Sequence, residues 1–432
     1  MAAVRPAAAA ERTATRAEPQ LLRFATAGSV DDGKSTLIGR LLYDAKALMA
    51  DQVADAEVDL ARLTDGLRAE REQGITIDVA YRHFQTPRRR FIIADTPGHA
   101  QYTRNMVTGA STADLAVVLV DAREGLLTQS RRHAAIAGLL RLPRIVLAVN
   151  KMDLVGFDQD VFRRICADFR SWAARLAGPE IACIPVSALE GDNVVERSAR
   201  MDWYGGPSLL EYLEGAPVAA GVADGPLRLP VQYVIRHERS GDERAARGSQ
   251  ARLYAGQLAG GTLRAGQEVV VLPSGMRTRI AAVETPEGPV EAAPAPLSVS
   301  VALEDEVDAG RGTLIAAVDA PPAASRDVRA TLCWLGENPA RVGGRYLLKH
   351  TTRGERARLE AIHHTLQVET LEPRPGADTL GLNEIGRVSL RTSAELHFDP
   401  YASNRSTGAF ILIDEASNET VGAGMLEDPL DG

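Results

Sequence analysis

The sequence predicts an α/β domain with a doubly wound, mostly parallel sheet, followed by two β-barrel domains. Apolar strands alternate with amphipathic helical stretches from residue 21 to about residue 216, the pattern of a parallel sheet covered on both faces. Beyond residue 217, short alternating runs are separated by Gly, Pro and Asp turns, as in β-barrels. The length of 432 residues also exceeds one ordinary core, because domains average about 150 residues.

The expected domain boundaries lie where this pattern changes. Residues 1–20 lack a sustained apolar run and include two acidic residues, so we expect a disordered tail rather than a transit peptide. The α/β domain is expected over residues 21–216, the first barrel over 217–325 and the second over 326–432. A stretch rich in Pro and Ala at 319–325 is expected to link the two barrels.

Four strands can be placed in the α/β domain, and each ends at or beside a polar residue. They are expected at residues 21–28, 90–95, 114–121 and 143–150. The carboxyl ends of the strands form the edge of a doubly wound sheet at which ligands bind. We therefore expect the functional site at these strand ends.

Composition argues against several classes of protein. The net charge is 49 minus 57, or -8, which gives no global basic field for nucleic acid. No apolar run approaches the ~18 residues of a membrane span. Cys166, Cys183 and Cys333 lie far apart with no CxxC spacing, which indicates neither a zinc site nor a disulfide framework. We expect a cytoplasmic protein with no nucleic acid and no membrane partner.

The first functional motif, GSVDDGKST, begins at the end of a predicted strand and precedes a helical stretch. It fits the phosphate-binding pattern G-x-x-x-x-G-K-[ST], whose backbone amides cradle phosphate oxygens. The glycines allow close backbone approach, Lys34 is expected to neutralise the β- and γ-phosphates, and Ser35 is expected to ligate Mg2+. The nucleotide-binding residues expected in this motif are Gly28, Ser29, Val30, Asp31, Asp32, Gly33, Lys34, Ser35 and Thr36.

A second motif, DTPGH, begins at the end of the strand at 90–95. Asp95 is expected to hold Mg2+ through water, and the amide of Gly98 to contact the γ-phosphate. His99 could then orient the attacking water. A histidine in a loop is more often structural than catalytic, but the neighbouring Asp95 and Gly98 favour the catalytic interpretation.

Two further motifs at strand ends select the base. NKMD supplies Asn150, Lys151 and Asp153, and SAL supplies Ser187 and Ala188, with a backbone amide for guanine O6. Guanine offers N1–H and N2–H donors to the carboxylate of Asp153, whereas adenine has an acceptor at N1, so the site favours GTP. Four motifs in order at strand ends predict a P-loop GTPase domain that uses GTP and Mg2+.

This order of motifs, with GITID between the first two and two β domains after the last, resembles the translational-type GTPases of the elongation factor Tu and 1A class. The resemblance covers residues 21–428. It implies that Thr76 in GITID closes over Mg2+ and the γ-phosphate, and that Val30 and Ile75 form an apolar gate beside His99. Lys34, Thr76 and His99 are the catalytic residues expected from the motifs and this resemblance together.

Several longer stretches resemble one branch of that class, the large, GTP-hydrolysing subunit of bacterial sulfate adenylyltransferase. These stretches are TDGLRAEREQGITIDVAYRHF, DTPGHAQYTRNMVTGASTADLAVVLVDAREGLLTQSRRH, RYLLKHTTR and NRSTGAFILID. The resemblance implies a hetero-oligomer with a smaller subunit that carries adenylyl transfer from ATP to sulfate, driven by GTP hydrolysis in this chain. Some relatives continue into a fused adenylylsulfate kinase, but only one phosphate-loop motif occurs here, so kinase activity is not expected.

The main alternative is an elongation-factor-like GTPase that delivers aminoacyl-tRNA to the ribosome, for which the fold would be the same. A regulatory GTPase that switches a partner without energising any chemistry is a third possibility. The branch-specific stretches and the absence of Lys-rich patches in the β domains argue against tRNA delivery.

Two charged features have competing interpretations. Asp32 stands where ribosomal relatives usually have His, and we expect its carboxylate to be exposed to solvent or paired with an arginine; a role in tuning hydrolysis is the alternative. The three arginines at 88–90 could contact a polyanion, but between two strands they are expected to form a solvated hairpin turn.

Overall fold

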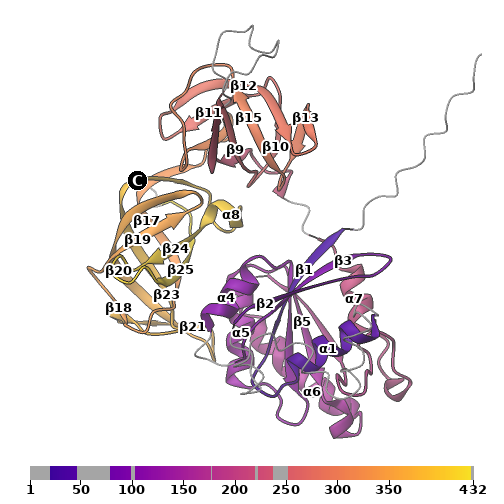
Figure 1. Cartoon of the computed structure of the whole chain (residues 1–432). Helices are drawn as coiled ribbons and strands as arrows, with labels where there is room; N and C mark the ends of the chain where they lie inside the picture. Colours follow the sequence, from indigo (N-terminus) through magenta and orange to yellow (C-terminus); the bar gives the residue numbers. More distant parts are fainter. Residues whose placement is uncertain are drawn as a thin grey trace, which may run out of the picture.

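The computed structural model describes residues 20–45, 78–98, 103–176, 178–218, 222–236 and 252–429. Figure 1 shows an N-terminal domain of helices and strands, followed by two domains built from strands. The predicted fold class, an α/β domain followed by two β-barrel domains, is confirmed.

The first domain is built on one sheet with the strand order β2-β3-β1-β4-β5-β6 in the described residues. Neighbouring strands are parallel except for the edge strand β2, which is antiparallel to β3. The strands are β1 (Leu21–Ala27), β2 (Ala80–Gln85), β3 (Arg90–Asp95), β4 (Leu115–Asp121), β5 (Arg144–Asn150) and β6 (Glu180–Pro185). The four predicted strands therefore lie within one residue of β1, β3, β4 and β5.

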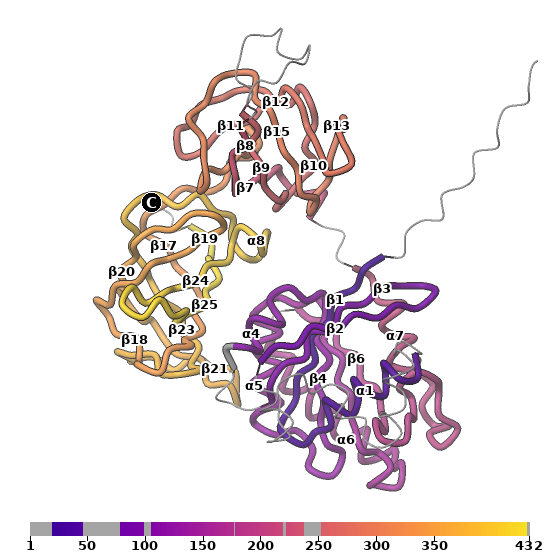
Figure 2. Tube along the Cα trace, viewed as in Figure 1, coloured from indigo at the N-terminus to yellow at the C-terminus, as the bar shows by residue number. Residues whose placement is uncertain are grey.

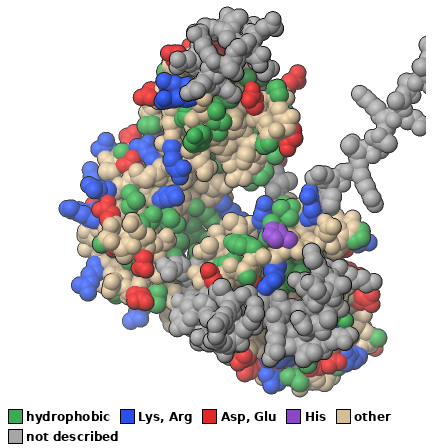
Figure 3. Space-filling model, viewed as in Figure 1, with side chains coloured by type: hydrophobic (Ala, Val, Ile, Leu, Met, Phe, Trp, Pro, Cys, Tyr) green, Lys and Arg blue, Asp and Glu red, His purple; other side chains and the backbone are tan. Residues whose placement is uncertain are grey.

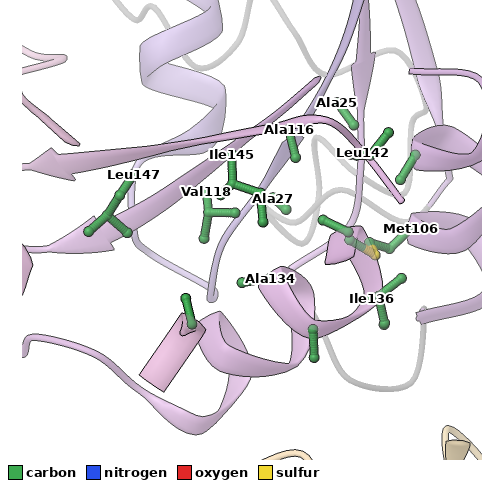
Figure 4. Close-up of a cluster of buried hydrophobic side chains, with 14 of the residues drawn as sticks. Ala25, Ala27, Met106, Ala116, Val118, Ala134, Ile136, Leu142, Ile145 and Leu147 are labelled. Carbon is green, nitrogen blue, oxygen red and sulfur yellow. The ribbon is translucent and has the colours of Figure 1, made fainter. Parts of the chain in front are cut away.

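Helices cover both faces of this sheet. All residues of β4 are buried, as its apolar run LAVVLV requires. One face packs against α4, α5 and α6, where Met106 of α4 and Ile136 of α5 lie in one apolar cluster with Val118 of β4 (Figure 4). The other face packs against α1 and α7. The helices are α1 (Lys34–Asp44), α4 (Thr103–Ser111), α5 (Thr128–Leu139), α6 (Gln159–Ala173) and α7 (Leu209–Gly215), with short 3-10 helices η2 (Met152–Val155) and η3 (Ala199–Met201).

The second domain is a barrel of short antiparallel strands. Its main sheet has the order β7-β16-β11-β12-β15-β9-β8. Backbone bonds from Arg228 N to Gly260 O at 3.0 Å and from Ala259 N to Arg228 O at 2.8 Å join the end strand β7 to the residues just after β9. The strands are β7 (Arg228–Pro230), β8 (Tyr233–Arg236), β9 (Arg252–Gln257), β10 (Thr262–Arg264), β11 (Glu268–Leu272), β12 (Met276–Thr285), β13 (Gly288–Val290), β14 (Ala292–Pro294), β15 (Ser298–Leu303) and β16 (Leu314–Ala317).

The third domain is a closed barrel. Its strands follow the order β19-β24-β25-β17-β23-β20, and pairing of β19 with β20 closes the ring, so that no edge is left open in it. The chain path is traced in Figure 2. The elements are β17 (Ala323–Trp334), β18 (Ala340–Arg341), β19 (Arg345–His350), β20 (Arg353–Gln367), β21 (Glu372–Pro375), β22 (Thr379–Leu380), β23 (Ile385–Phe398), α8 (Arg405–Gly408), β24 (Ala409–Ile413) and β25 (Thr420–Leu426). Because β17 starts at Ala323, the predicted linker at 319–325 already includes the first residues of this barrel.

The hairpin between β2 and β3 corrects one expectation. The arginines at 88–90 do lie at a hairpin, but the side chain of Arg89 is only 6% exposed. Its guanidinium donates to the carbonyl oxygens of Leu213, at 3.0 Å, and Ala216 at the end of α7. A fully solvated turn is therefore wrong for Arg89, because its positive charge satisfies carbonyls at the C-terminus of a helix.

The surface shows no large field of one sign on the face drawn in Figure 3, where basic and acidic side chains are interspersed. Among the described helices, none is long and apolar enough to cross a membrane.

Candidate functional site

Four loops of the first domain lie at the carboxyl edge of its sheet. The loop after β1 carries GSVDDGKST, the end of β3 leads into DTPG, the end of β5 into NKMD, and β6 into SAL. These four strands are parallel through the chain of pairings that includes β4, so their carboxyl ends face the same way. The motifs that sequence reasoning placed at strand ends therefore meet in the folded chain.

The phosphate loop is closed on itself by Lys34. Its Nζ donates to the carbonyl oxygen of Gly28 at 3.0 Å and to that of Ser29 at 2.7 Å. Gly33 precedes α1 with a φ of 91°, a conformation that residues with a side chain rarely adopt. A Cβ at Gly33 would also lie 2.5 Å from Nδ2 of Asn150. Glycine is required there both by the backbone and by the approach of NKMD.

The DTPG segment lies against the same lysine. A Cβ at Gly98 would collide with Nζ of Lys34 and would lie 2.9 Å from the carbonyl oxygen of Gly28. Asp95 is buried at the end of β3, and its Oδ1 accepts a hydrogen bond from the Thr26 hydroxyl at 3.3 Å. Burial lowers the pKa of Lys34, and the nearby carboxylates, including Asp95, oppose that shift. The ammonium of Lys34 is thus a buried positive charge with carboxylates nearby.

The donor atoms at this edge fit Mg2+. Ser35 is the second residue of α1, directly after Lys34, and Asp95 lies near that lysine. Hydroxyl and carboxylate oxygens are the ligands that Mg2+ uses, usually few from the protein and the rest from phosphate and water. No cluster of three or more His, Cys, Asp and Glu side chains that could hold a metal occurs in the part of the chain that the structure describes.

Asn150 joins the phosphate loop to the SAL segment. Its Nδ2 donates to the carbonyl oxygen of Asp32 at 2.7 Å, and its Oδ1 accepts from the amide of Ala188 at 2.9 Å. Next to it, the hydroxyl of Ser187 donates to Oδ1 of Asp153 at 2.6 Å. Three loops that are far apart in sequence are therefore fixed relative to one another by side chains of NKMD and SAL.

Lys151 makes a second bridge and involves a residue that sequence reasoning missed. Its Nζ donates to the carbonyl oxygen of Asp31 at 2.5 Å and pairs with the carboxylate of Asp121 at 2.9 Å. Burial alone would raise the pKa of Asp121, but hydrogen bonds from Arg123 and Lys151 outweigh it and hold that pKa well below its usual range. Asp121 is the polar residue at the end of β4, as Asp95 is at the end of β3, and this position at a strand end could have identified it.

His133 is the other missed residue. It is fully buried in α5, and its Nδ1 accepts the amide of Gly28 at 3.1 Å, while Nε2 lies 3.0 Å from the side-chain amide of Gln129. Burial lowers the pKa of His133 to about 3, with Lys34 adding to the effect, so the ring is neutral. The run HAAIAG in which it stands gave no sign of this contact with the phosphate loop.

The structure contradicts the expected environment of Asp32. Its side chain is only 2% exposed, and its Oδ2 accepts the amide of Ser29 at 2.5 Å rather than an arginine. Burial raises the pKa of Asp32 to about 6, although the Ser29 amide, Lys34 and Lys151 all oppose the rise. The carboxylate folds back into its own loop, a contact that the spacing of residues in the motif does not reveal.

Asp32→Asn is expected to stabilise the nucleotide-free protein above about pH 6, by about 2 kcal/mol, because it removes a buried charge and keeps an acceptor for the Ser29 amide. The pKa rises from 3.8 unfolded to about 6 folded, so the carboxylate lowers stability as pH rises through that range and the loss persists above it. Urea unfolding of both proteins across about pH 4 to 8 checks this. A difference in unfolding free energy that does not change with pH would contradict it.

The remaining predicted residues are placed as follows. Ser35 and Thr36 lie in the first turn of α1 and are half-buried, and the side chain of Val30 is 38% exposed. Thr76 and His99, the predicted metal-binding and catalytic residues, fall outside the described residues, as does Ile75 of the expected apolar gate.

Comparison with known proteins gives both domain-level and whole-chain matches. The family model for the elongation factor Tu GTP binding domain matches residues 19–218, and the GTP-eEF1A C-terminal domain-like model matches residues 327–427. A bifunctional enzyme CysN/CysC of Mycobacterium tuberculosis (strain ATCC 25618 / H37Rv) is 55% identical over 94% of this chain and 67% of that protein. The chain thus spans about two thirds of the length of that relative.

Two further matches extend over most of both partners. A sulfate adenylyltransferase subunit 1 of Bacteroides fragilis (strain YCH46) is 47% identical over 95% of this chain and 87% of that protein. Among solved structures, a crystal structure of sup35 complexed with GMPPNP covers 96% of this chain and 95% of its own, with 22% identity and a TM-score of 0.44.

Proposed function

The chain belongs to the family of sulfate adenylyltransferase subunit 1, with a GTP-binding domain of the elongation factor Tu type, and from that premise we propose that it is the GTP-hydrolysing subunit of a sulfate adenylyltransferase. The proposal rests on Asn150, whose side chain hydrogen-bonds to both the phosphate loop and the SAL segment. These bonds hold the phosphate-binding and base-binding segments together in one site. Hydrolysis here drives formation of adenosine 5'-phosphosulfate and pyrophosphate from ATP and sulfate, with adenylyl transfer on a smaller partner subunit.

Nucleotide binding in this proposal divides between two halves of the site. Amides of the loop at 28–36 and the ammonium of Lys34 hold the phosphates. The carboxylate of Asp153, oriented by the Ser187 hydroxyl, accepts from guanine N1–H and N2–H, and a backbone amide of SAL donates to O6. The base is thereby selected by hydrogen-bond donors that adenine lacks.

Hydrolysis uses the residues next to the γ-phosphate. Mg2+, when bound, neutralises charge that develops on the transferred phosphoryl group. Ser35, Thr76 and Asp95 would hold that ion, Asp95 through water. The amide of Gly98 contacts the γ-phosphate, and His99 orients the attacking water.

Coupling between the two reactions requires linked conformations. The phosphosulfate anhydride is a high-energy linkage, so ATP and sulfate alone favour the reactants. GTP hydrolysis shifts that balance only if segments around Thr76 and Gly98 are ordered by GTP and released afterwards, and if the partner senses the difference.

The proposal is tested by purifying the chain with and without its smaller subunit and following pyrophosphate release from ATP and sulfate while GTP is varied. Release is expected to require both chains and to rise with GTP. Turnover that is independent of GTP, or no sulfate-dependent turnover with the authentic partner, would contradict it. Tight binding of aminoacyl-tRNA with a non-hydrolysable GTP analogue would instead support the elongation-factor alternative.

A further inference from the structure

The SAL turn, residues 187–191, follows β6 and is held by a side chain of α1. Nε of Arg40 donates to the carbonyl oxygen of Ala188 at 3.3 Å, and Nη2 of the same side chain donates to the carbonyl oxygen of Leu189. Arg40 stands six residues after Lys34 in α1, the helix that begins at the phosphate loop. One guanidinium therefore connects the phosphate-binding helix with the segment that is expected to bind the base.

The guanidinium of Arg40 is itself held by its own helix. Nη1 lies 3.5 Å from Oδ1 of Asp44, one turn further along α1, and the two side chains are only 21% and 26% exposed. The SAL turn lies against this ion pair, because a Cβ at Gly191 would be 3.4 Å from Oδ2 of Asp44 and 3.6 Å from Cδ of Arg40. Pairing with Asp44 therefore keeps the guanidinium beside the turn rather than in solvent.

The bonds from Arg40 to carbonyl oxygens also fix the direction of the amides in the turn. In a trans peptide the C=O and the following N–H point to opposite sides within one plane. Because both carbonyl oxygens point toward Arg40, the amides of Leu189 and Glu190 point away from it. The amide of Glu190 donates to the hydroxyl oxygen of Ser187 at 3.2 Å. By holding two carbonyl oxygens, Arg40 thus sets the direction in which the turn presents its donors.

NKMD holds the buried start of the same turn. Oδ1 of Asn150 accepts the amide of Ala188 at 2.9 Å, and Oδ1 of Asp153 accepts the hydroxyl of Ser187 at 2.6 Å. Ala188 is 1% exposed, whereas Leu189 is 62% exposed. Packing therefore fixes the start of the turn but not its outer part, where the bonds from the guanidinium hold the backbone.

We propose that Arg40 is a positioning residue for base selection, which holds the carbonyl oxygens of the SAL turn and so keeps a backbone amide of that turn in place for guanine O6. The inference rests on the proposed GTP binding and adds a residue that sets the selectivity of that site. Arg40 is assigned no contact with the nucleotide. Asp153, which receives guanine N1–H and N2–H, is oriented instead by the buried Ser187 at the start of the turn. Recognition of O6 should therefore depend on Arg40, and recognition of the 2-amino group should not.

The test uses two analogues of GTP that each change one group of the base. 6-Thioguanosine triphosphate has sulfur, a weak acceptor, in place of O6 and keeps N1–H and the 2-amino group. Inosine triphosphate keeps O6 and N1–H but lacks the 2-amino group. The affinity of the full chain for GTP and for each analogue is measured by calorimetric titration. In the wild type both analogues should bind more weakly than GTP.

Arg40→Met keeps an unbranched stem but removes every donor. The affinity for GTP is expected to fall about three- to tenfold, the range for one lost hydrogen bond between neutral groups. Because the amide is no longer held toward O6, the preference for GTP over the 6-thio analogue should fall toward one, while the preference over inosine triphosphate stays unchanged. Arg40→Lys can still reach one carbonyl oxygen, so it should give an intermediate preference, and it also tests the proposal if Arg40→Met does not fold.

The matched control is Arg144→Met. The side chain of Arg144 is 18% exposed, pairs with Glu180 at 3.1 Å and donates to the carbonyl oxygen of Pro217 at 2.8 Å, so its contacts are of the same kind as those of Arg40. Arg144 begins β5, whereas Asn150 ends that strand at the candidate site. The control should therefore bind all three nucleotides with the preferences of the wild type.

The outcomes separate the inference from the proposed function. A wild-type chain that does not bind GTP refutes the proposed function itself. A wild-type chain that binds GTP without preferring it over the 6-thio analogue overturns the inference, and so does a preference that the Arg40 variants share with the wild type. Equal losses for all three nucleotides in Arg40→Met, or the same change in Arg144→Met, also overturn it, because they would indicate a general loosening of the domain.

Discussion

Asp153→Asn is expected to lower the affinity for GTP about a thousandfold and to create measurable affinity for xanthosine triphosphate. Two charge-assisted hydrogen bonds from guanine N1–H and N2–H to the carboxylate are each worth about 1.5 to 3 kcal/mol. The asparagine side chain has no negative charge, and its N–H donor would face the N–H donors of guanine, so no hydrogen bond can form between them. Because about 1.4 kcal/mol is a factor of ten, a thousandfold loss corresponds to ~4 kcal/mol.

Xanthine carries a carbonyl at position 2 in place of the amino group, so it accepts the hydrogen bond that the new amide offers. The orientation of the side chain should survive, since the Ser187 hydroxyl that donates to Oδ1 of Asp153 can donate equally to an amide oxygen. The substitution therefore tests the chemistry of the base rather than the folding of the loop.

Affinities are measured by titrating fluorescent GTP and by competition with unlabelled GTP and xanthosine triphosphate. Asp158→Asn is the matched control, because Asp158 is a carboxylate five residues further on that caps α6 through Oδ1, and asparagine caps equally well. The control should bind GTP as the wild type does. Unchanged GTP affinity in Asp153→Asn would show that Asp153 does not read the base.

The strands of the first domain could be predicted from sequence because each is a local apolar run. β4 reads LAVVLV and is buried throughout, so no distant contact was needed to identify it. The phosphate loop was predictable for a similar reason, since the glycine at 33 has the left-handed backbone that the motif demands. Features that are determined by about ten consecutive residues could therefore be predicted from the sequence.

Features that depend on distant contacts were not accessible. The burial of Arg89 against the end of α7 depends on where that helix comes to lie. The contact of Asp32 with the Ser29 amide spans only three residues, but it depends on the conformation of the loop, which the motif alone does not give. Cys166 and Cys183 appeared unrelated, yet α6 and β6 bring their free thiols close enough for each to shift the pKa of the other. In each case side-chain types were visible but their partners were not.

Asp399→Asn is expected to lower the free energy of unfolding by about 3 to 5 kcal/mol. The side chain of Arg228 is only 2% exposed, and Asp399 takes two of its N–H groups at 2.8 Å each. Removing the carboxylate leaves a guanidinium buried without its counter-charge, although its other bonds, to the carbonyl oxygens of Leu227 and Ala320, remain. That desolvated charge, rather than the lost attraction, accounts for most of the expected cost.

The double variant Arg228→Met with Asp399→Asn should recover at least about half of that loss, because no unpaired charge then remains in the interface. Non-additivity of this kind is expected for side chains in direct contact. Arg279→Met is the control within the second domain, since its pair with Glu268 is also 2.8 Å long but more than half exposed on both sides. It should cost no more than about 1 kcal/mol.

Denaturant unfolding followed by the fluorescence of the tryptophans, which include the buried Trp334 of the third barrel, compares the four proteins. Equal midpoints for Asp399→Asn and Arg279→Met would mean that the pair between the second and third domains is no more important than a surface pair. A double variant less stable than Asp399→Asn alone would mean that Arg228 acts mainly through its carbonyl bonds. If Asp399→Asn is the least stable of the four proteins, the contact between the second and third domains depends on the mutual neutralisation of two buried charges.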